Sequence, residues 1–137
     1  MILKDRSASG ALTALLLLGM AMGCTGSAAP RFDAGELSPG SCRDMGTQLV
    51  DVERTQRELL AGKTDAKAAA AGYAATQDRL IEVYQADPDV AEPVRALVTA
   101  LGIFRIGVDA GSLADSHAEA VRTSLADVVT RCGVDLS

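Results

Sequence analysis

Large aromatic side chains are scarce in this 137-residue chain, which has no tryptophan, two tyrosines, two phenylalanines and one histidine. Several site sequences are also missing. There is no Cys-x-x-Cys-His sequence for haem attachment, no Glu-x-x-His pair for a di-iron centre, and no Gly-x-Ser-x-Gly or phosphate-binding loop. We therefore expect no metal, no cofactor and no enzymatic activity.

The chain also lacks a hydrophobic run long enough to cross a bilayer. Its longest apolar stretch, residues 11–23, has thirteen mostly apolar residues and follows a short head that contains Lys4, Asp5 and Arg6. A membrane-spanning helix needs about 20 such residues. Thirteen fits the apolar region of an export signal instead, which predicts that residues 1–23 are a signal peptide removed during export.

The stretch ends in Ala21, Met22, Gly23 and Cys24. Small residues at the first and third positions before Cys24 give a peptidase close access to the backbone. This sequence resembles the lipobox of bacterial lipoprotein precursors, although most lipoboxes have leucine where Ala21 stands and a small residue where Met22 stands. The resemblance implies that Cys24 is diacylated, becomes the new N-terminus and anchors the protein to the outer face of the cytoplasmic membrane.

An alternative is open, because Ala-x-Gly before Cys24 also suits an ordinary signal peptidase. Cys24 would then begin a secreted protein. The cysteine count favours lipidation. The chain has three cysteines, and a lipidated Cys24 leaves Cys42 and Cys132 as an even pair that can form a disulfide outside the cell.

The chain that follows residue 23 is acidic, with 11 basic and 17 acidic side chains. Phosphate backbones and anionic headgroups repel such a surface, so we expect no nucleic-acid partner, and membrane attachment through the lipid on Cys24. Arginine outnumbers lysine and alanine is abundant, a bias common in the GC-rich genomes of actinobacteria. Beyond the lipobox, the chain resembles only the loose class of small bacterial lipoproteins with a two-cysteine helical domain, a likeness that assigns no functional residues.

Residues 24–40 are predicted to be the lipidated cysteine and a flexible tether. Thr25 to Pro39 is rich in Gly, Ser, Ala and Pro and has no helical or strand period. Random-coil scaling gives it a mean span of about 20 Å. Phe32 is its one large apolar side chain. We expect Phe32 to be in solvent or loosely docked, the alternative being a short recognition element.

From residue 41 onward, apolar residues recur every three or four positions, which predicts helices that each bury one face. Four segments follow from caps, glycines and Pro88, at about 41–61, 64–87, 89–108 and 112–132. Ser41, Asp89 and Ser112 are the expected N-caps of the first, third and fourth segments. Pro93 offers an alternative start for the third, with 88–92 as a separate turn.

Four helices of this length with short loops predict an all-α, up-down-up-down antiparallel four-helix bundle over residues 41–134. In that topology the start of the first helix and the end of the fourth lie at the same end. Cys42 and Cys132 occupy these two places on the apolar stripes. The sequence therefore predicts a Cys42–Cys132 disulfide.

His117 is predicted to have a structural role. At 1.5 Å per residue along antiparallel helices, it falls near the level of Gln56 and Phe104, and a Gln56–His117 hydrogen bond is expected. Asp115 and Glu119 are two residues away on either side and point to other faces of the helix, so they cannot form a metal site with His117 alone.

Two features suggest binding surfaces. The second segment is rich in alanine, and the third contains Gly102 and Gly107. These small residues favour close helix packing, while the alternative is a groove near Tyr73, Tyr84 and Phe104 for a lipid-like ligand or a partner helix. The third segment also has apolar residues beyond its stripe, which either widen its buried arc or form a docking patch: Val98, Ile103 and Ile106.

These observations predict a membrane-tethered helical module of the cell envelope that interacts with an envelope protein or has a structural role. The competing expectation is a lipoprotein that holds a small apolar molecule between its helices. A ligand of that kind would stabilise the folded state, whereas an interaction module would be captured with a partner by cross-linking.

Overall fold

The computed structural model describes residues 30–136, and every regular element within them is helical. The predicted all-α class is therefore confirmed for this part of the chain. The signal peptide, Cys24 and residues 25–29 lie outside the described residues. The elements are the 3-10 helix η2 (Ala34–Glu36), the single-turn helix α2 (Ser41–Asp44) and four long helices, α3 (Gly46–Leu60), α4 (Ala66–Ala86), α5 (Pro88–Asp109) and α6 (Asp115–Arg131).

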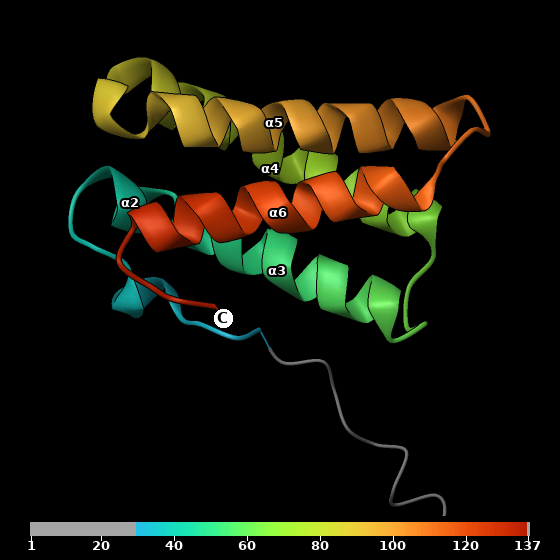
Figure 1. Cartoon of the computed structure of the whole chain (residues 1–137), viewed down its shortest axis with the longest axis horizontal. Helices are drawn as coiled ribbons and strands as arrows, with labels where there is room; N and C mark the ends of the chain where they lie inside the picture. The colour runs from blue at the N-terminus through green and yellow to red at the C-terminus, as the bar shows by residue number, and fades with distance from the viewer. Residues whose placement is uncertain (1–29, 137) are drawn as a thin grey trace, which may run out of the picture.

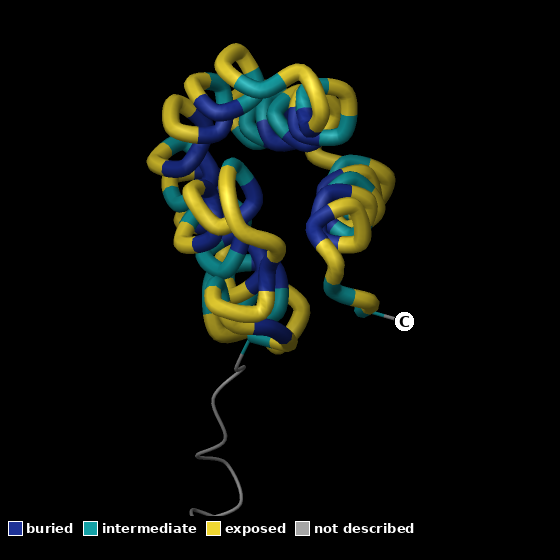
Figure 2. Tube along the Cα trace, turned by 90° about the vertical axis from the view of Figure 1, so that its left-hand side faces the viewer, coloured by how far each residue is buried: buried dark blue, intermediate teal, exposed yellow. Residues whose placement is uncertain are grey.

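Successive long helices pack side by side, and the first of them also meets the last (Figure 1). α4 lies against α3 and α5, while α6 lies against α5 and, less extensively, against α3. Viewed along the helices in Figure 2, the buried positions lie mainly on the sides that face one another. The seam between α3 and α6 is the most weakly packed of the four helix–helix contacts.

The core consists of the stripes that the helical period predicted. Each long helix contributes fully buried aliphatic or aromatic side chains to one continuous cluster. The largest of them are Leu49 and Val52 from α3, Tyr73 and Leu80 from α4, Val94, Leu97, Leu101 and Phe104 from α5, and Leu125 from α6. A shared apolar face on every helix explains why the four helices enclose a common interior.

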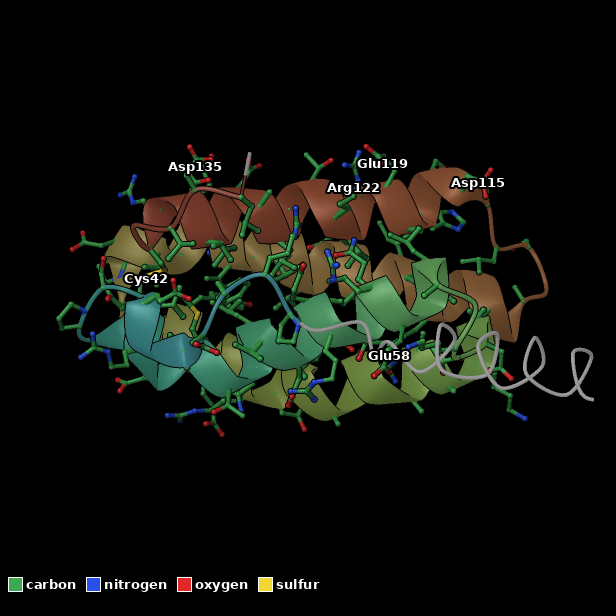
Figure 3. The ribbon with its side chains drawn as sticks, turned by 90° about the horizontal axis from the view of Figure 1, so that it is seen from below. Cys42, Glu58, Asp115, Glu119, Arg122 and Asp135 are labelled. Carbon is green, nitrogen blue, oxygen red and sulfur yellow. A yellow bond between two sulfur atoms is a disulfide. The ribbon has the colours of Figure 1, made fainter. Side chains whose placement is uncertain are left out.

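The predicted disulfide is also present, between Cys42 of α2 and Cys132 just after α6. Their Cα atoms lie 5.6 Å apart although 90 positions separate them in the sequence. Ser38 adds to this junction, because its backbone N–H and its hydroxyl both donate to the carbonyl of Cys132 at 2.9 Å. In Figure 3, Cys42 and Asp115 mark opposite ends of the helical body.

The first predicted helix is divided in two. It is interrupted at Met45, which is buried and separates α2 from α3. The expected N-cap, Ser41, is instead the first residue of α2, and Gly40 occupies the cap position with a φ of 90°. That left-handed backbone conformation is one that glycine adopts without steric cost, and it lets the chain enter the helix without a side-chain cap.

Asp87, rather than Asp89, caps the start of α5. Its carboxylate accepts hydrogen bonds from the Ser41 hydroxyl at 2.6 Å and from the Asp89 backbone N–H at 2.9 Å. Both bonds favour the charged form, so they lower the pKa of Asp87, the Ser41 bond most strongly. Pro88 opens α5 directly and Pro93 lies inside it, so residues 88–92 are not a separate turn.

The start of α6 also differs from the prediction. Ala114, rather than Ser112, is the residue before the helix, and its backbone N–H donates to Nδ1 of His117 at 3.1 Å. The predicted Gln56–His117 bond is therefore wrong, since the His117 side chain caps the start of its own helix. Gly107 of α5 makes room for the ring, because a Cβ there would lie 2.8 Å from His117 Nδ1.

The expectation of a solvated Phe32 is wrong. Phe32 and Leu37 are 2% and 1% exposed and belong to the core cluster. Between them, η2 brings Ala34 against Gly46 of α3, where a Cβ would lie 2.7 Å from the Ala34 Cβ. Burial of the two large side chains offsets the entropy of ordering this segment. We call residues 30–40 the strap.

Candidate functional site

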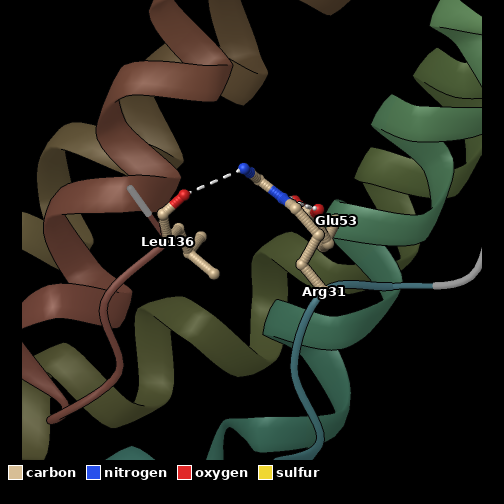
Figure 4. Close-up of polar contacts among 3 residues, drawn as sticks. All are labelled: Arg31, Glu53 and Leu136. Atoms are coloured by element: carbon tan, nitrogen blue, oxygen red, sulfur yellow. Dashed lines mark hydrogen bonds and ion pairs between the residues drawn. The ribbon is translucent and has the colours of Figure 1, made fainter.

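The strap lies on the seam between α3 and α6, and Arg31 is its main polar attachment. The Arg31 guanidinium donates from Nε to Oε1 of Glu53 at 2.7 Å and from Nη2 to Oε2 at 3.4 Å. Its third contact is a 3.2 Å bond from Nη1 to the carbonyl oxygen of Leu136 (Figure 4). Arg31 therefore connects α3, the strap and the C-terminal segment beyond α6.

Glu53 is the one carboxylate buried in the described body, with a relative side-chain exposure of 1%. A carboxylate removed from water is costly unless it is paired and hydrogen-bonded. Arg31 meets this need with a two-point contact from the partly exposed side of the seam. The pair is thus a clasp that the folded strap completes, rather than a carboxylate open to a substrate.

Tyr73 of α4 experiences the field of the same carboxylate. Burial raises the pKa of its phenol to about 12, and the negative charge of Glu53 adds to the shift. On its other side, the Tyr73 ring packs edge-on against Phe104, with ring centroids 5.1 Å apart. The centre of the body therefore contains an aromatic pair close to a buried carboxylate, whose cation comes from the partly exposed Arg31.

The raised pKa of Tyr73 predicts a loss of stability at high pH. In the unfolded chain the phenol ionises near its ordinary value of 10.0, whereas in the folded chain it stays protonated up to about pH 12. Its contribution is fully present below pH 10 and is lost as the pH rises toward 12, by about 2–3 kcal/mol over that window. Tyrosinate absorbance of a Tyr84→Phe variant, in which Tyr73 is the remaining tyrosine, measures the shift directly.

Adding Glu53→Gln to the Tyr84→Phe variant should lower the Tyr73 pKa without restoring it to 10.0, because burial is the larger cause. Ionisation of Tyr73 near pH 10 in the folded Tyr84→Phe protein would contradict the buried position of this phenol.

Two cavities follow the same seam. One, of about 300 Å³, lies beside the strap and the outer side of α6, and it is lined in part by Arg31, Ala126, Thr130 and Leu136. The other, of about 220 Å³, lies where α3 ends and α6 begins, among residues such as Gln56, Leu59, Leu60 and Ala118. Arg122 lines both cavities and forms an ion pair with Glu119 of its own helix.

The residues predicted for a groove have packed positions. Tyr73 and Phe104 are fully buried against one another. Tyr84 is partly buried, and the Arg95 guanidinium lies 5.4 Å from its ring centroid. A ligand at Tyr73 and Phe104 would have to separate α4 from α5.

Two glycines of α4 and α5 are not required for the packing of their helices. A Cβ at Gly72 would lie 3.4 Å from Thr55 Oγ1 of α3, and one at Gly102 would lie 3.5 Å from Gln77 Nε2, both ordinary van der Waals distances. The exposed side of the alanine-rich stripe lines a further hollow of about 230 Å³. Of the apolar residues beyond the α5 stripe, Val98 packs partly against the core, while Ile103 and Ile106 are exposed.

Sequence reasoning missed Arg31 and Glu53. Glu53 follows Val52 on the buried side of α3. The only sign of its burial in the sequence is that it is an acidic residue on an otherwise apolar helix face. Its partner comes from a segment without periodicity, so no spacing rule could pair them. Comparison with known protein families, curated proteins and solved structures gave no match.

Residues 30–136 contain no group of three or more His, Cys, Asp or Glu side chains placed to hold a metal ion. None of the helices in this range is long and apolar enough to cross a membrane.

Proposed function

We propose that this protein is an exported lipoprotein whose Cys24 carries the anchoring lipid on the outer face of the cytoplasmic membrane. The observation that carries the proposal is the Cys42–Cys132 disulfide. It accounts for two of the three cysteines and leaves Cys24, which follows the lipobox-like residues, as the third. Lipidation gives that remaining cysteine a role, since an unpaired thiol on an exported protein is otherwise exposed to oxidation.

We further propose that residues 41–134 are an antiparallel, up-down-up-down four-helix bundle that serves as an interaction or structural module of the envelope and has no enzymatic activity. The ring of contacts from α3 through α4 and α5 to α6 and back to α3 supports this topology. The hydrogen bonding of two buried polar side chains supports a structural role. The Glu53 carboxylate is held by Arg31, and Gln77 bonds both Arg105 and the Val98 carbonyl.

The direct test is the chemical state of residue 24 in protein isolated from bacterial membranes. Mass spectrometry of the N-terminal peptide should find Cys24 as the first residue with a thioether-linked diacylglyceryl group. A Cys24→Ser variant should lose that group and leave the membrane fraction, while Cys42 and Cys132 stay paired. An N-terminal Cys24 with an unmodified thiol, or a retained residue 1–23 segment, would contradict the proposal.

The module role is tested separately, by cross-linking the lipidated protein in cells and identifying what is captured. An envelope protein that is captured by the wild type but not by a variant altered on one exposed helix face would identify the partner and its surface. If variants altered on each exposed helix face leave the bacterial envelope unchanged and no partner is captured, the result would argue against an interaction module.

A further inference from the structure

The exposed large hydrophobic side chains of residues 30–136 are not spread evenly over the body. There are four of them, and they lie toward the end opposite the disulfide: Leu60, Ile103, Ile106 and Leu113. Leu60 ends α3 and is 75% exposed, and Ile106, in the last turn of α5, is 68% exposed. We call the end formed by residues 60–66 and 106–115 the distal end.

The strap leads toward the distal end. Followed backwards from residue 40, the strap runs from the disulfide end, where Ser38 bonds Cys132, to the middle of α3, where Arg31 bonds Glu53. From Glu53 to Leu60 the remaining part of α3 is about 10 Å long at 1.5 Å per residue. The direction of the strap thus takes the chain from the disulfide toward the exposed apolar end.

The chain between the strap and Cys24 is short enough to restrict the body. Seven positions separate Cys24 from Arg31, and a fully extended chain of that length spans at most about 25 Å. Since the strap is packed on the body, it is not available as tether. A lipid on Cys24 would therefore keep Arg31 within about 25 Å of the bilayer surface, and Leu60, about 10 Å farther along α3, within about 35 Å.

From these observations we propose that the distal end docks on the lipid bilayer that holds Cys24, with Leu60 and Leu113 entering the membrane interface. The inference rests on the proposed lipidation of Cys24. Exposed apolar side chains at one end of a body that is tethered close to a bilayer suit an interface where one side is apolar and the other is wet. The tether adds a high local concentration of lipid, so a contact too weak to bind a free domain is maintained.

Charge is not the attraction in this contact. The distal end has Lys63, with Lys67 just beyond it in α4, but also Asp65, Asp109 and Asp115, so the charges in this region are of both signs. The contact is apolar, with the long lysine side chains able to reach the headgroups. We therefore expect docking on neutral phosphatidylcholine vesicles and on vesicles that also contain phosphatidylglycerol.

The experiment places an environment-sensitive fluorophore at Leu60→Cys in the full lipidated protein, under conditions that leave the disulfide intact. Gln85→Cys is the matched control, because it is an exposed position near the end of α4 at the disulfide end. On vesicles, the probe at residue 60 should shift to the blue and be quenched by lipid-attached quenchers, and the probe at residue 85 should show neither effect. Leu60 is exposed, so the substitution leaves the core intact.

Flotation of the same samples separates the two proposals. Protein that fails to float with vesicles would contradict lipid anchoring through Cys24. Protein that floats but shows equal signals at residues 60 and 85, or a signal only with phosphatidylglycerol, would overturn apolar docking of the distal end. A Leu60→Ser/Leu113→Ser variant should still float, while a third probe at Ile106→Cys loses most of its blue shift relative to the same probe without the serine changes.

Releasing the strap gives an independent check. Arg31→Ala with Phe32→Ala removes the attachments of the N-terminal part of the strap, which lengthens the tether toward the buried Leu37. The protein should float as before, but the difference between probes at residues 60 and 85 should shrink. An unchanged difference in a variant that is still folded by circular dichroism would overturn the proposed role of the short tether.

Discussion

Replacing Cys42 and Cys132 together by alanine is expected to lower the free energy of unfolding by about 3–4 kcal/mol. The bond closes a loop across 90 positions and joins α2 to the end of α6. Without it, the unfolded chain gains the conformational freedom that the cross-link removes, and two buried side chains shrink. Urea unfolding measures the loss, and the melting temperature should fall by at least about 10 °C.

The matched control is the wild-type protein after reduction, which removes the bond without removing sulfur. Reduced wild type and the double alanine variant should unfold at similar urea concentrations, with the variant slightly less stable because of its smaller side chains. A loss below about 1 kcal/mol in both would mean that packing and the Ser38–Cys132 hydrogen bonds already hold the two ends together, contrary to the loop-closure argument.

The parts of the fold that the sequence predicted are those governed by local period and cysteine number. The stripe through Leu97, Leu101 and Phe104 is buried because residues three and four apart share one helix face. The Cys42–Cys132 pairing followed from the same reasoning, since the order of four helices places the two cysteines at one end. Such inferences require only that each helix bury its apolar face.

The parts that were missed depend on contacts between distant segments. Nothing near Phe32 in sequence indicates burial, because its site is formed by helices that follow it. Ser41 is a residue type that is common at N-caps, but its hydroxyl donates instead to the carboxylate of Asp87, 46 positions later. The His117 side chain caps the start of α6, because Gly107 on another helix leaves space for its ring. In each case tertiary packing overrides a local preference.

The candidate site shows the same limit. Its buried acid is visible in the sequence only as a charge on an apolar arc, and its basic partner lies in a stretch that composition assigns to a flexible linker. Residues 30–40, which the sequence assigns to a flexible linker, are packed on the body instead. A single packed segment thus supplies half of the site and shortens the stretch that composition assigns to a linker.

Replacing Arg31 by alanine is expected to destabilise the protein by about 2 kcal/mol. The change leaves the fully buried Glu53 carboxylate without its cation, while Arg31 itself is 40% exposed, which limits the loss because water can partly replace it. Arg54→Ala is the matched control. Arg54 pairs with Asp51 on the surface of the same helix at 2.9 Å, and its loss should cost no more than about 0.5 kcal/mol.

A double-mutant cycle with Glu53→Leu separates the ion pair from the strap as a whole. If the cost of Arg31→Ala comes from a stranded carboxylate, it should largely disappear in the Glu53→Leu background, because a buried leucine needs no cation. Denaturant unfolding of the four proteins gives the coupling energy. An equal cost of Arg31→Ala in both backgrounds would transfer the role of Arg31 from Glu53 to the Leu136 carbonyl, and would make the strap a clasp on the C-terminal segment rather than on α3.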